Sequence, residues 1–367
     1  IQEMERTGLY LDRGKAQELK SELLSQSVQI LDQLQTQFPD VFQKEHKYRT
    51  RDKHKKTSLV FDREQDGFFV FNEYGPFNPK SSQQIACVLA DLGWKPTKKT
   101  DKGAIKTDEK TLEEIDDEAI APTANKILKY KKLEKISTGF IEPLAGEHLG
   151  KDGYVRGNFN QCVTLTGRLS SSNPNLQNIP RQSDLGKRMR GIFTVENGWK
   201  LFDGDLSNIE ARMVAFYMWL ICNDSSLARI FIEKRDFHTS NSEDWDVPRD
   251  AAKKTFFSKI YGAGLGRLSR DLGCSYHEAK AIVRKINSKC PALDTLISDV
   301  IETARQEVGV IHTLLGRRLV YRNLLSDRDE LRAEAERQVF NALIQGSSAD
   351  VLKALTVDSM PIVRRYN

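Results

Sequence analysis

The amino-acid sequence predicts an α+β fold with long helices and a few short strands. Three observations predict this class. Within residues 1–42, leucines recur at helical spacing after the opening IQEMERTGLYLD; residues 154–159 alternate as in a strand; and residues 311–321 read as a hairpin. With 367 residues, the chain is long enough for two or three domains and for a sizeable core.

The composition excludes some classes of protein. No run approaches the ~18 apolar residues that a membrane span needs, and no secretory signal opens the chain. The five cysteines are scattered without a CxxC pair, which favours a reducing compartment over a zinc site or a disulfide framework. We therefore predict a cytoplasmic protein with no membrane partner. Because the sequence starts at Ile1, we expect a fragment or a processed chain.

Charge is distributed unevenly, although the net charge is only +5. Residues 43–56 carry seven Lys or Arg against two acids, and residues 126–135 carry five Lys against one acid. Such patches indicate either nucleic acid as a partner or a solvated charged face.

The first half of the chain reads as helices with basic edges. Residues 43–74 are polar and basic, then aromatic, and predict a loop plus a hairpin inserted between helices. Ser81 or Ser82 is expected to cap the next helix. Residues 125–140 form a basic amphipathic helix that we expect to end near Gly139.

The second half is helical over residues 264–310, and residues 330–363 predict one or two further helices. On the latter, Arg337, Asn341 and Gln345 recur every fourth residue and form a polar stripe on an otherwise apolar helix. Because buried amides must find partners, this stripe faces either solvent or a polar ligand.

Residues 201–212, LFDGDLSNIEAR, read as a short strand that turns into a helix. Ser207 and Glu210 have the spacing of a capping box. Asp205, at the predicted strand tip, is well placed to hold a hard cation, because Mg²⁺ takes oxygen ligands. A carboxylate at such a tip is common without a metal, so other segments must decide its role.

A polar, turn-rich segment covers residues 164–180. It contains Arg168 and four amide side chains, Asn173, Asn175, Gln177 and Asn178. Turn chemistry explains Asn173-Pro174. Amides also carry donors and acceptors suited to base edges, so both interpretations of the others stay open.

Residues 249–262, RDAAKKTFFSKIYG, place two cations and two aromatic rings on one helical stripe. Arg249, Lys253, Phe257 and Tyr261 recur every fourth residue. Cations neutralise phosphate oxygens and a ring offers a stacking surface, so the stripe suits a nucleotide. The alternative is an amphipathic helix with its rings in the core. His238, just upstream, could reach a phosphate or be merely hydrogen-bonded.

Together these segments resemble the family A DNA polymerases, of the polymerase I type. Four ordered motifs carry the resemblance. They are TGRLSSSNPNLQNIP at 166–180, similar to the template-primer motif; DLSNIEAR at 205–212, similar to the first catalytic carboxylate motif; RDAAKKTFFSKIYG at 249–262, similar to the fingers helix; and NALIQGSSAD at 341–350, similar to the segment before the second carboxylate motif. The opening ME-x-x-G-x-x-x-D resembles the thumb of bacteriophage replicative polymerases.

The resemblance implies a right-hand polymerase fold in the bacterial or phage-infected host cytoplasm. Its expected parts are a helical thumb at 1–148 with a basic insertion near 43–74, the first part of the palm at 149–215, helical fingers at 216–330, and an incomplete return to the palm at 331–367. The palm would carry Asp205 on an antiparallel sheet.

It also implies partners and residue roles for a template-directed DNA polymerase that extends a primer with dNTPs. The primer 3′-hydroxyl would attack the α-phosphate in line, between two Mg²⁺ ions that Mn²⁺ could replace. Asp205 and the Leu206 carbonyl would hold the ions, and Glu210 with Tyr261 would exclude a 2′-hydroxyl. The dNTP contacts would be Arg249, Lys253, Phe257, Tyr261, His238, Leu206, Ser207 and Asn208, with Lys253 also a general acid. The primer-template contacts would be Arg168, Asn175, Gln177, Asn178, Arg337, Asn341 and Gln345.

One expected part is missing from the sequence. The family's second carboxylate motif, His-Asp-Glu, should follow Gln345 by a few tens of residues, yet no histidine follows His312 before Asn367. Because one anchoring Asp binds cations weakly, we predict that this chain is inactive alone and that a longer parent is active.

Two other functions compete with this prediction. A non-catalytic primer-template binding protein derived from a polymerase would be expected to lose Asp205, Lys253 and Tyr261, which are all present. An unrelated helical nucleic-acid-binding protein would leave the four ordered motifs unexplained. The basic insertion could contact duplex DNA or a processivity factor, or form a solvated loop.

Overall fold

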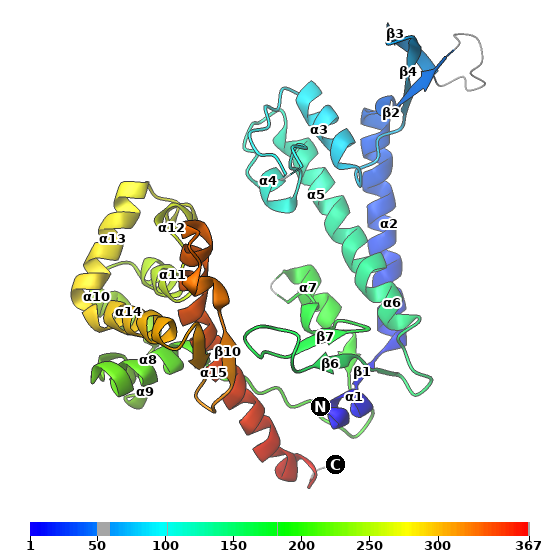
Figure 1. Cartoon of the computed structure of the whole chain (residues 1–367). Helices are drawn as coiled ribbons and strands as arrows, with labels where there is room; N and C mark the ends of the chain where they lie inside the picture. Colours follow the sequence, from blue (N-terminus) through cyan, green and yellow to red (C-terminus); the bar gives the residue numbers. More distant parts are fainter. Residues whose placement is uncertain (50–58, 101, 182, 366–367) are drawn as a thin grey trace. The chain divides into compact units, whose positions relative to one another are not determined.

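The computed structural model describes residues 1–49, 59–100, 102–181 and 183–365, which form two compact units (Figure 1). Unit 1 comprises Ile1–Asn158 with Ser171–Leu201, and unit 2 comprises Phe159–Ser170 with Phe202–Asn367. Each unit combines helices and short strands around its own apolar core, so the predicted α+β class is confirmed. No helix within the described ranges is long and apolar enough to cross a membrane.

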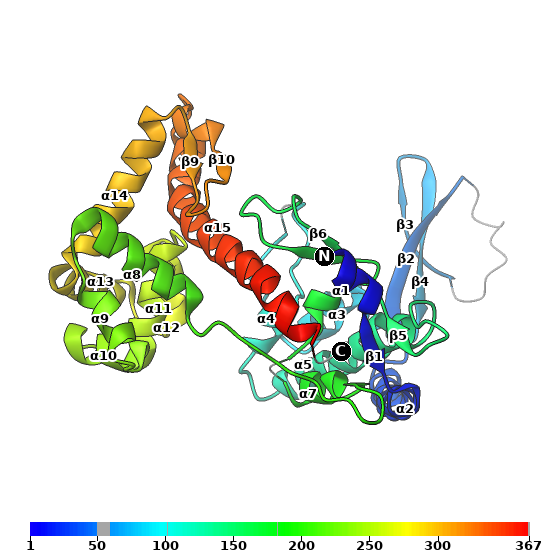
Figure 2. The same cartoon turned by 90° about the horizontal axis from the view of Figure 1, so that it is seen from below.

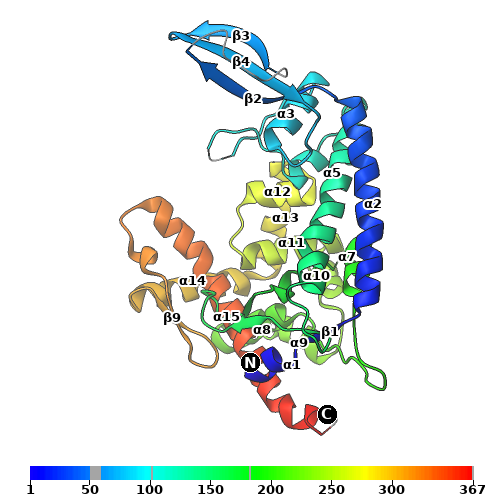
Figure 3. The same cartoon turned by 90° about the vertical axis from the view of Figure 1, so that its right-hand side faces the viewer.

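Unit 1 is built on two long helices, α2 (Arg13–Gln37) and α5 (Ala121–Ile136), which pack side by side (Figures 1 and 3). The Asp12 side chain starts α2 by accepting a hydrogen bond from the backbone N of Lys15 at 3.0 Å. The leucines at helical spacing include Leu19, Leu23 and Leu34, which are buried, so the predicted long helix is present as α2.

The predicted helix end near Gly139 is wrong. The helical path continues from α5 through the π-helical turn η1 (Ser137–Ile141) into α6 (Glu142–Ala145). Pro143 falls in the first turn of α6, where its missing N–H is not needed, so it does not break the path. The hydroxyl of Ser137 donates to the Leu133 carbonyl at 2.9 Å within the continuous turn.

The insertion is a three-stranded antiparallel sheet in the order β2-β4-β3, made of β2 (Val41–Tyr48), β3 (Leu59–Gln65) and β4 (Phe68–Gly75). The predicted hairpin is present, but the loop predicted from residue 43 onward begins as a strand. Cross-strand partners explain the difference, because Tyr48 pairs with Phe69 in the register of β2 and β4. Residues 50–56 of the basic run lie outside the described residues.

The remaining elements of unit 1 support these helices. Ser81 caps α3 by accepting from the backbone N of Gln84 at 3.3 Å, as predicted. A second antiparallel sheet has the order β5-β1-β8. The elements are α1 (Gln2–Thr7), β1 (Leu9–Leu11), α3 (Ser82–Asp91), α4 (Glu109–Glu113), β5 (Tyr154–Val155), η2 (Leu176–Asn178), α7 (Asp184–Arg190) and β8 (Phe193–Thr194). The predicted strand at 154–159 is split between β5 and β6 (Asn158–Asn160), which pairs with β7 (Ser170–Ser172).

Unit 2 is mainly helical, and Figure 2 shows its β9–β10 hairpin beside α15. The helices predicted over residues 264–310 are present, and residues 330–363 belong to one helix. The hairpin turns at Gly316, whose φ is +81°. The elements are α8 (Ile209–Cys222), α9 (Ser226–Ile232), α10 (Phe237–Trp245), α11 (Arg249–Ile260), α12 (Leu265–Leu272), α13 (Tyr276–Lys289), α14 (Pro291–Gln306), β9 (Val310–His312), β10 (Arg318–Val320), η3 (Arg322–Leu325) and α15 (Asp329–Val363).

Two predictions about residues 201–210 are wrong. Residues 201–206 form no strand, so Asp205 is not carried on a sheet; Leu201 is 65% exposed and Phe202 is 92% exposed, and neither packs against a partner strand. The predicted capping box of Ser207 and Glu210 is also wrong. The cap of α8 is Asn208, in the left-handed region with φ 54°, and it makes no side-chain capping bond. The boundaries of thumb, palm and fingers stay predictions.

Candidate active site

Glu210 is the centre of a side-chain cluster in unit 2. It lies in the first turn of α8 and is only 9% exposed. Tyr261, at the C-terminal end of α11, donates its hydroxyl to Oε2 of Glu210 at 2.6 Å, and Arg168 donates Nη2 to Oε1. A carboxylate that accepts from a guanidinium and a phenol has both oxygens fixed in direction. Three segments far apart in sequence thus converge on one acidic group.

Tyr261 keeps its proton in this cluster. Burial, followed by the hydrogen bond to the Glu210 carboxylate, raises the pKa of the phenol above its usual range. The hydroxyl therefore remains a donor at neutral pH.

An aromatic row extends from Tyr261 along α11. The ring of Phe257 stacks on that of Tyr261, with 5.9 Å between centroids and 23° between planes. On its other side, Phe257 lies 5.9 Å from the ring of His238 on α10. Both rings of the predicted stripe are thus at the surface or partly exposed rather than buried in the core, and Lys253 on the same helix is exposed.

The two basic residues of the stripe surround His238 with positive charge. Burial, then Lys253 and Arg249, lower the pKa of His238, so its imidazole is neutral at neutral pH. Arg249 is fixed by two hydrogen bonds, from Nε to Thr239 Oγ1 at 3.1 Å and from Nη2 to Asp236 Oδ1 at 3.2 Å. This end of α11 therefore presents oriented donors and an excess of positive charge.

Asp236 is a residue that the sequence interpretation missed. Its carboxylate caps α10 by accepting from the backbone N of Thr239 at 2.8 Å, and it also pairs with Arg249. The Thr239 hydroxyl and backbone hydrogen bonds and then Arg249 lower the pKa of Asp236 to about 2. The signal was present as Asp-x-x-Thr before a helix, which is a capping pattern.

Asp205 and Leu206 lie in the irregular segment before α8, where the Asp205 carboxylate is exposed. Over the part of the chain that the structure describes, no three His, Cys, Asp or Glu side chains converge to hold a metal ion. Mg²⁺ often uses one or two carboxylates together with substrate phosphates, so these two residues fit part of such a ligand set. A pair of ions needs oxygen ligands beyond them. The neighbouring Ser207 carbonyl accepts from Arg212 Nε at 2.9 Å, and Asn208 caps the helix.

The polar stripe of α15 continues beside the end of α11. Arg337 is exposed, and a Cβ added to Gly262 would lie 2.6 Å from the Arg337 Cβ, so the two backbones approach closely. Asn341 and Gln345 are half-buried. The Oδ1 atom of Asn341 is buried and has no hydrogen-bond partner among the described residues, so it is an unsatisfied acceptor.

The predicted DNA contacts Asn175, Gln177 and Asn178 lie in unit 1, all exposed on or beside η2. The side chain of Asn175 accepts from the backbone N of Gln177 at 3.1 Å. Turn chemistry therefore accounts for Asn175, whereas no such bond engages the side chains of the other two within the described ranges.

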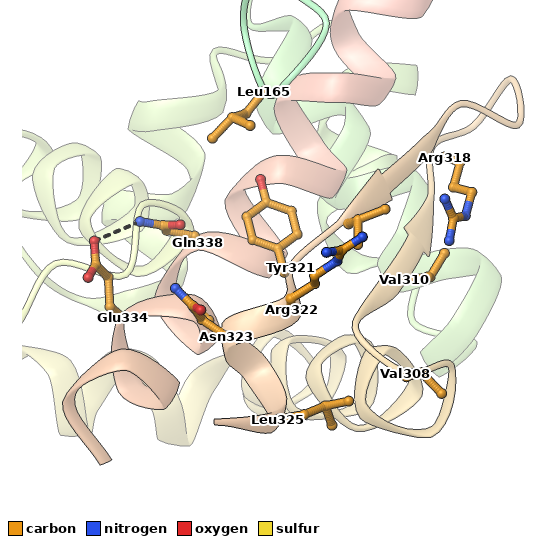
Figure 4. A pocket seen from close by; sticks show the side chains of 12 residues that line it. Leu165, Val308, Val310, Arg318, Tyr321, Arg322, Asn323, Leu325, Glu334 and Gln338 are labelled. Carbon is orange, nitrogen blue, oxygen red and sulfur yellow. Dashed lines mark hydrogen bonds between the residues drawn. The ribbon is translucent and has the colours of Figure 1, made fainter. Parts of the chain in front are cut away.

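A cavity of about 700 Å³ lies elsewhere in unit 2, between the β9–β10 hairpin, η3 and the start of α15. Figure 4 shows Tyr321 pointing toward Leu165, with Arg322 beside it and the Glu334–Gln338 hydrogen bond at the opposite wall. None of the predicted site residues lines this cavity. The candidate active site is thus a surface, as suits a polymeric ligand, and not this hollow.

Sequence comparison identifies the class of protein that this surface belongs to. Residues 63–366 match the sequence model of DNA polymerase family A, and the chain belongs to that family.

The chain is 38% identical to the thermostable DNA polymerase I of Thermus aquaticus over 298 residues, which cover 78% of the chain and 35% of that relative. It is 32% identical to DNA polymerase I of Bacillus subtilis strain 168 over 293 residues, covering 77% and 32% respectively. It thus spans about a third of the length of these curated relatives.

A solved structure supports the polymerase fold. The POL domain of Pol1 from M. smegmatis, in complex with a DNA primer-template and dNTP, matches with a TM-score of 0.79 and 27% identity, over 99% of this chain and 59% of that one. The predicted polymerase fold is therefore confirmed.

Proposed function

We propose that the chain is the core of a template-directed DNA polymerase that extends a primer 3′ end with dNTPs. The observation that carries the proposal is the cluster in which Arg168 and Tyr261 both bind Glu210 beside the basic and aromatic row of α11. Membership of family A supports it. The relative from M. smegmatis was solved with the two ligands that the proposal requires.

On the nucleotide side, α11 supplies charge at one end and aromatic surface at the other. Arg249 and Lys253 would bind the triphosphate, and the neutral His238 would donate a hydrogen bond to it. Lys253 would also return a proton to the departing pyrophosphate. Phe257 would face the sugar, and its lack of a hydroxyl favours discrimination against dideoxynucleotides.

Glu210 would act as the steric gate next to the sugar. Because Tyr261 and Arg168 hold both of its oxygens, the carboxylate cannot swing away without breaking two hydrogen bonds. A 2′-hydroxyl at this position would meet a fixed group, whereas a deoxyribose would not.

On the DNA side, the α15 stripe and Arg168 would contact the minor groove near the primer end. The exposed guanidinium of Arg337 and the side-chain amide N–H groups of Asn341 and Gln345 would donate to minor-groove acceptors and backbone atoms. Asn175, Gln177 and Asn178 would contribute contacts from unit 1. Because minor-groove acceptors are similar for all base pairs, such contacts would fix the primer end without selecting a sequence.

Two Mg²⁺ ions, or Mn²⁺ in their place, would neutralise charge on the attacking and leaving oxygens when bound. Asp205 and the Leu206 carbonyl are our proposed ligands from this chain. The chain's own residues do the rest of the positioning, with Arg249 and Lys253 on the triphosphate and Arg168 at the primer end.

Primer extension tests the proposal. The chain, a version extended past Asn367, and the extended version carrying Asp205→Ala are compared with Mg²⁺ and four dNTPs. Asp203→Ala is the matched control, because Asp203 is an exposed carboxylate two residues away in the same segment. We expect the extended wild type and its Asp203→Ala variant to extend the primer, and the Asp205→Ala variant not to.

The non-catalytic alternative has its own signature in this assay. If the extended protein binds primer-template but never incorporates a nucleotide, the result would favour a non-catalytic DNA-binding protein over a polymerase. Stabilisation of the complex by the matched dNTP on a dideoxy-terminated primer would argue against an unrelated nucleic-acid-binding protein, whose affinity would depend on salt but not on nucleotide.

We also propose that the basic run 43–56, whose first residues lie in β2, contacts duplex DNA or a processivity factor. Lys44 and Lys47 are exposed on β2. Reversing both charges to Glu should lower DNA affinity or processivity. Unchanged values would instead indicate a solvated surface. Cytoplasmic localisation stays a prediction.

A further inference from the structure

The loop that carries Arg168 is held by side chains of α15 and of the β9–β10 hairpin that take no part in the proposed function. The carbonyl of Gly167 accepts a hydrogen bond from Lys353 Nζ of α15 at 2.6 Å. Gly167 has φ +73°, and a Cβ added there would lie 2.8 Å from the guanidinium of Arg317. Two cationic side chains thus bracket the residue next to Arg168, one by a hydrogen bond and one by contact.

Arg317 is itself anchored by the carboxylate of Asp350. Its Nε and Nη2 atoms donate to Asp350 Oδ1 at 2.9 and 2.7 Å, and Thr313 donates its hydroxyl to Oδ2. Asp350 is 4% exposed. Thr313 Oγ1 also accepts from the backbone N of Arg317 at 3.0 Å, so the hairpin turn and α15 share one closed network.

Close backbone packing leaves the loop little freedom on the α15 side. A Cβ added to Gly346 would lie 2.6 Å from Thr313 Cγ2 and 3.3 Å from the Thr166 carbonyl. At the other end of the turn, Thr164 Oγ1 donates to the Arg168 carbonyl at 2.7 Å. The backbone on both sides of Gly167 is therefore fixed, and this fixes the direction from which Arg168 leaves it.

A contribution to stability alone does not explain this arrangement well. An ion pair with one buried partner, such as Arg317 with Asp350, is weak support for stability, because desolvating charge offsets much of the attraction. Lys353 could also extend into solvent at little cost from a long exposed helix. Instead its ammonium is partly buried, which together with Arg317 lowers the pKa of Lys353, and it donates to one backbone carbonyl.

We propose that Lys353, Arg317 and Asp350 are positioning residues that hold Gly167 so that Arg168 reaches both Glu210 and the primer-template. The inference rests on the proposed function, because the DNA contact of Arg168 belongs to that function. Within the described residues, the hydrogen bond and ion pair of the Arg168 side chain go to Glu210 and to none of these three side chains, so we infer that they act on Arg168 through the backbone of residues 166–168. Lys353 is the best residue to test, since it makes a single hydrogen bond at the edge of the network.

The test combines two measurements on the whole 367-residue chain. Hydrogen–deuterium exchange of the segment 159–170 reports on the loop without DNA, and fluorescence anisotropy reports primer-template affinity. The variants are Lys353→Met, the conservative Lys353→Arg, Arg168→Gln and the double variant. Lys280→Met, which removes an exposed lysine of α13, is the matched control.

We expect Lys353→Met to raise exchange in segment 159–170 and to weaken primer-template binding about tenfold, the scale of one charge-assisted hydrogen bond. Lys353→Arg should restore most of both. In the Arg168→Gln background, Lys353→Met should have little further effect on affinity, because its effect passes through Arg168. Lys280→Met should change exchange in this segment and affinity by less than about twofold.

Unchanged exchange in segment 159–170 would overturn the inference, since the loop would not depend on Lys353. An equal loss of affinity in both backgrounds would overturn it too, because a general folding defect does not depend on Arg168. If the wild-type chain fails to bind primer-template at all, the proposed function fails, and the exchange measurement still decides whether the network holds the loop.

Discussion

Tyr261→Phe tests how firmly the gate carboxylate is held. The substitution keeps the ring, and so the stacking on Phe257, but removes the hydroxyl that donates to Glu210 Oε2 at 2.6 Å. Glu210 is 9% exposed, so water replaces the lost donor poorly. Hydrogen bonds to charged groups contribute about 1.5–3 kcal/mol. Because Tyr261 is itself 44% exposed, we expect the lower part of that range, about 1.5–2 kcal/mol of unfolding free energy.

Thermal unfolding of the chain followed by circular dichroism measures this loss. For a unit of roughly 150–250 residues, 1 kcal/mol corresponds to about 2–4 °C, so we expect the Tm of unit 2 to fall by about 3–8 °C. Tyr276→Phe is the control, because it removes the hydroxyl of an exposed tyrosine on α13 of the same unit. That change should stay within about 0.5 kcal/mol.

The pH dependence gives a second readout. The folded-state pKa of Tyr261 is raised above the unfolded value of about 10, so its stabilisation is complete below pH ~10 and is lost as pH rises beyond it. Tyr261→Phe should therefore flatten the decline of stability in the alkaline range. Equal Tm values and equal alkaline slopes for Tyr261→Phe and Tyr276→Phe would refute the view that the phenol holds Glu210.

Three further outcomes follow from the same region. Gly262→Ala should destabilise the chain to urea by more than about 1 kcal/mol, because φ is +62° and the new Cβ would meet Arg337 Cβ at 2.6 Å; an unchanged midpoint would contradict the close approach. Asp236→Asn keeps a capping side chain for Thr239 but removes the charge. The wild type loses stability as pH falls from ~4 to about 2, because the Asp236 carboxylate is protonated there, and the variant should lack this part of the loss; identical acid unfolding curves of the two proteins would count against it. His238→Gln should reduce the loss of stability as pH falls below ~6.5. The reason is that the folded-state pKa of His238 is lowered, so protonation of the imidazole favours unfolding. Acid titration followed by circular dichroism measures the difference between the two proteins.

Much of the fold could be predicted because periodicity and turn chemistry act locally. The α2 helix and the β9–β10 hairpin with Gly316 follow from local patterns, and so does the helical character of residues 330–363, although the sequence left open whether they form one helix or two. Predictions failed where non-local contacts decide the structure. The polar residues 43–48 become a strand only because β4 pairs with them, and Gly139 stays helical because a π-helical turn absorbs it.

The site shows the same division. The stripe of α11 was visible in the sequence because its residues share one helix face. The convergence of Arg168 and Tyr261 on Glu210 joins residues 42 and 51 positions apart, so spacing along the chain does not predict it. Only the pair of Glu210 and Tyr261 was expected, and that expectation came from the family resemblance. The Ser207–Glu210 spacing misled the capping prediction for a physical reason: Glu210 is occupied by those two donors and does not turn back to the helix terminus.

The uninterrupted α15 also sets a limit on how this sequence can change. Arg337, Asn341 and Gln345 lie on the same helix as Asp350 and Lys353, with only the buried Gly346, Ser347, Ser348 and Ala349 between the two sets. Each residue of an α-helix turns the chain by about 100°. A single insertion or deletion among those four small residues would turn the polar stripe and the anchors of the Gly167 loop to different sides of the helix. We therefore expect the length of this segment to be fixed, even where its side chains can vary.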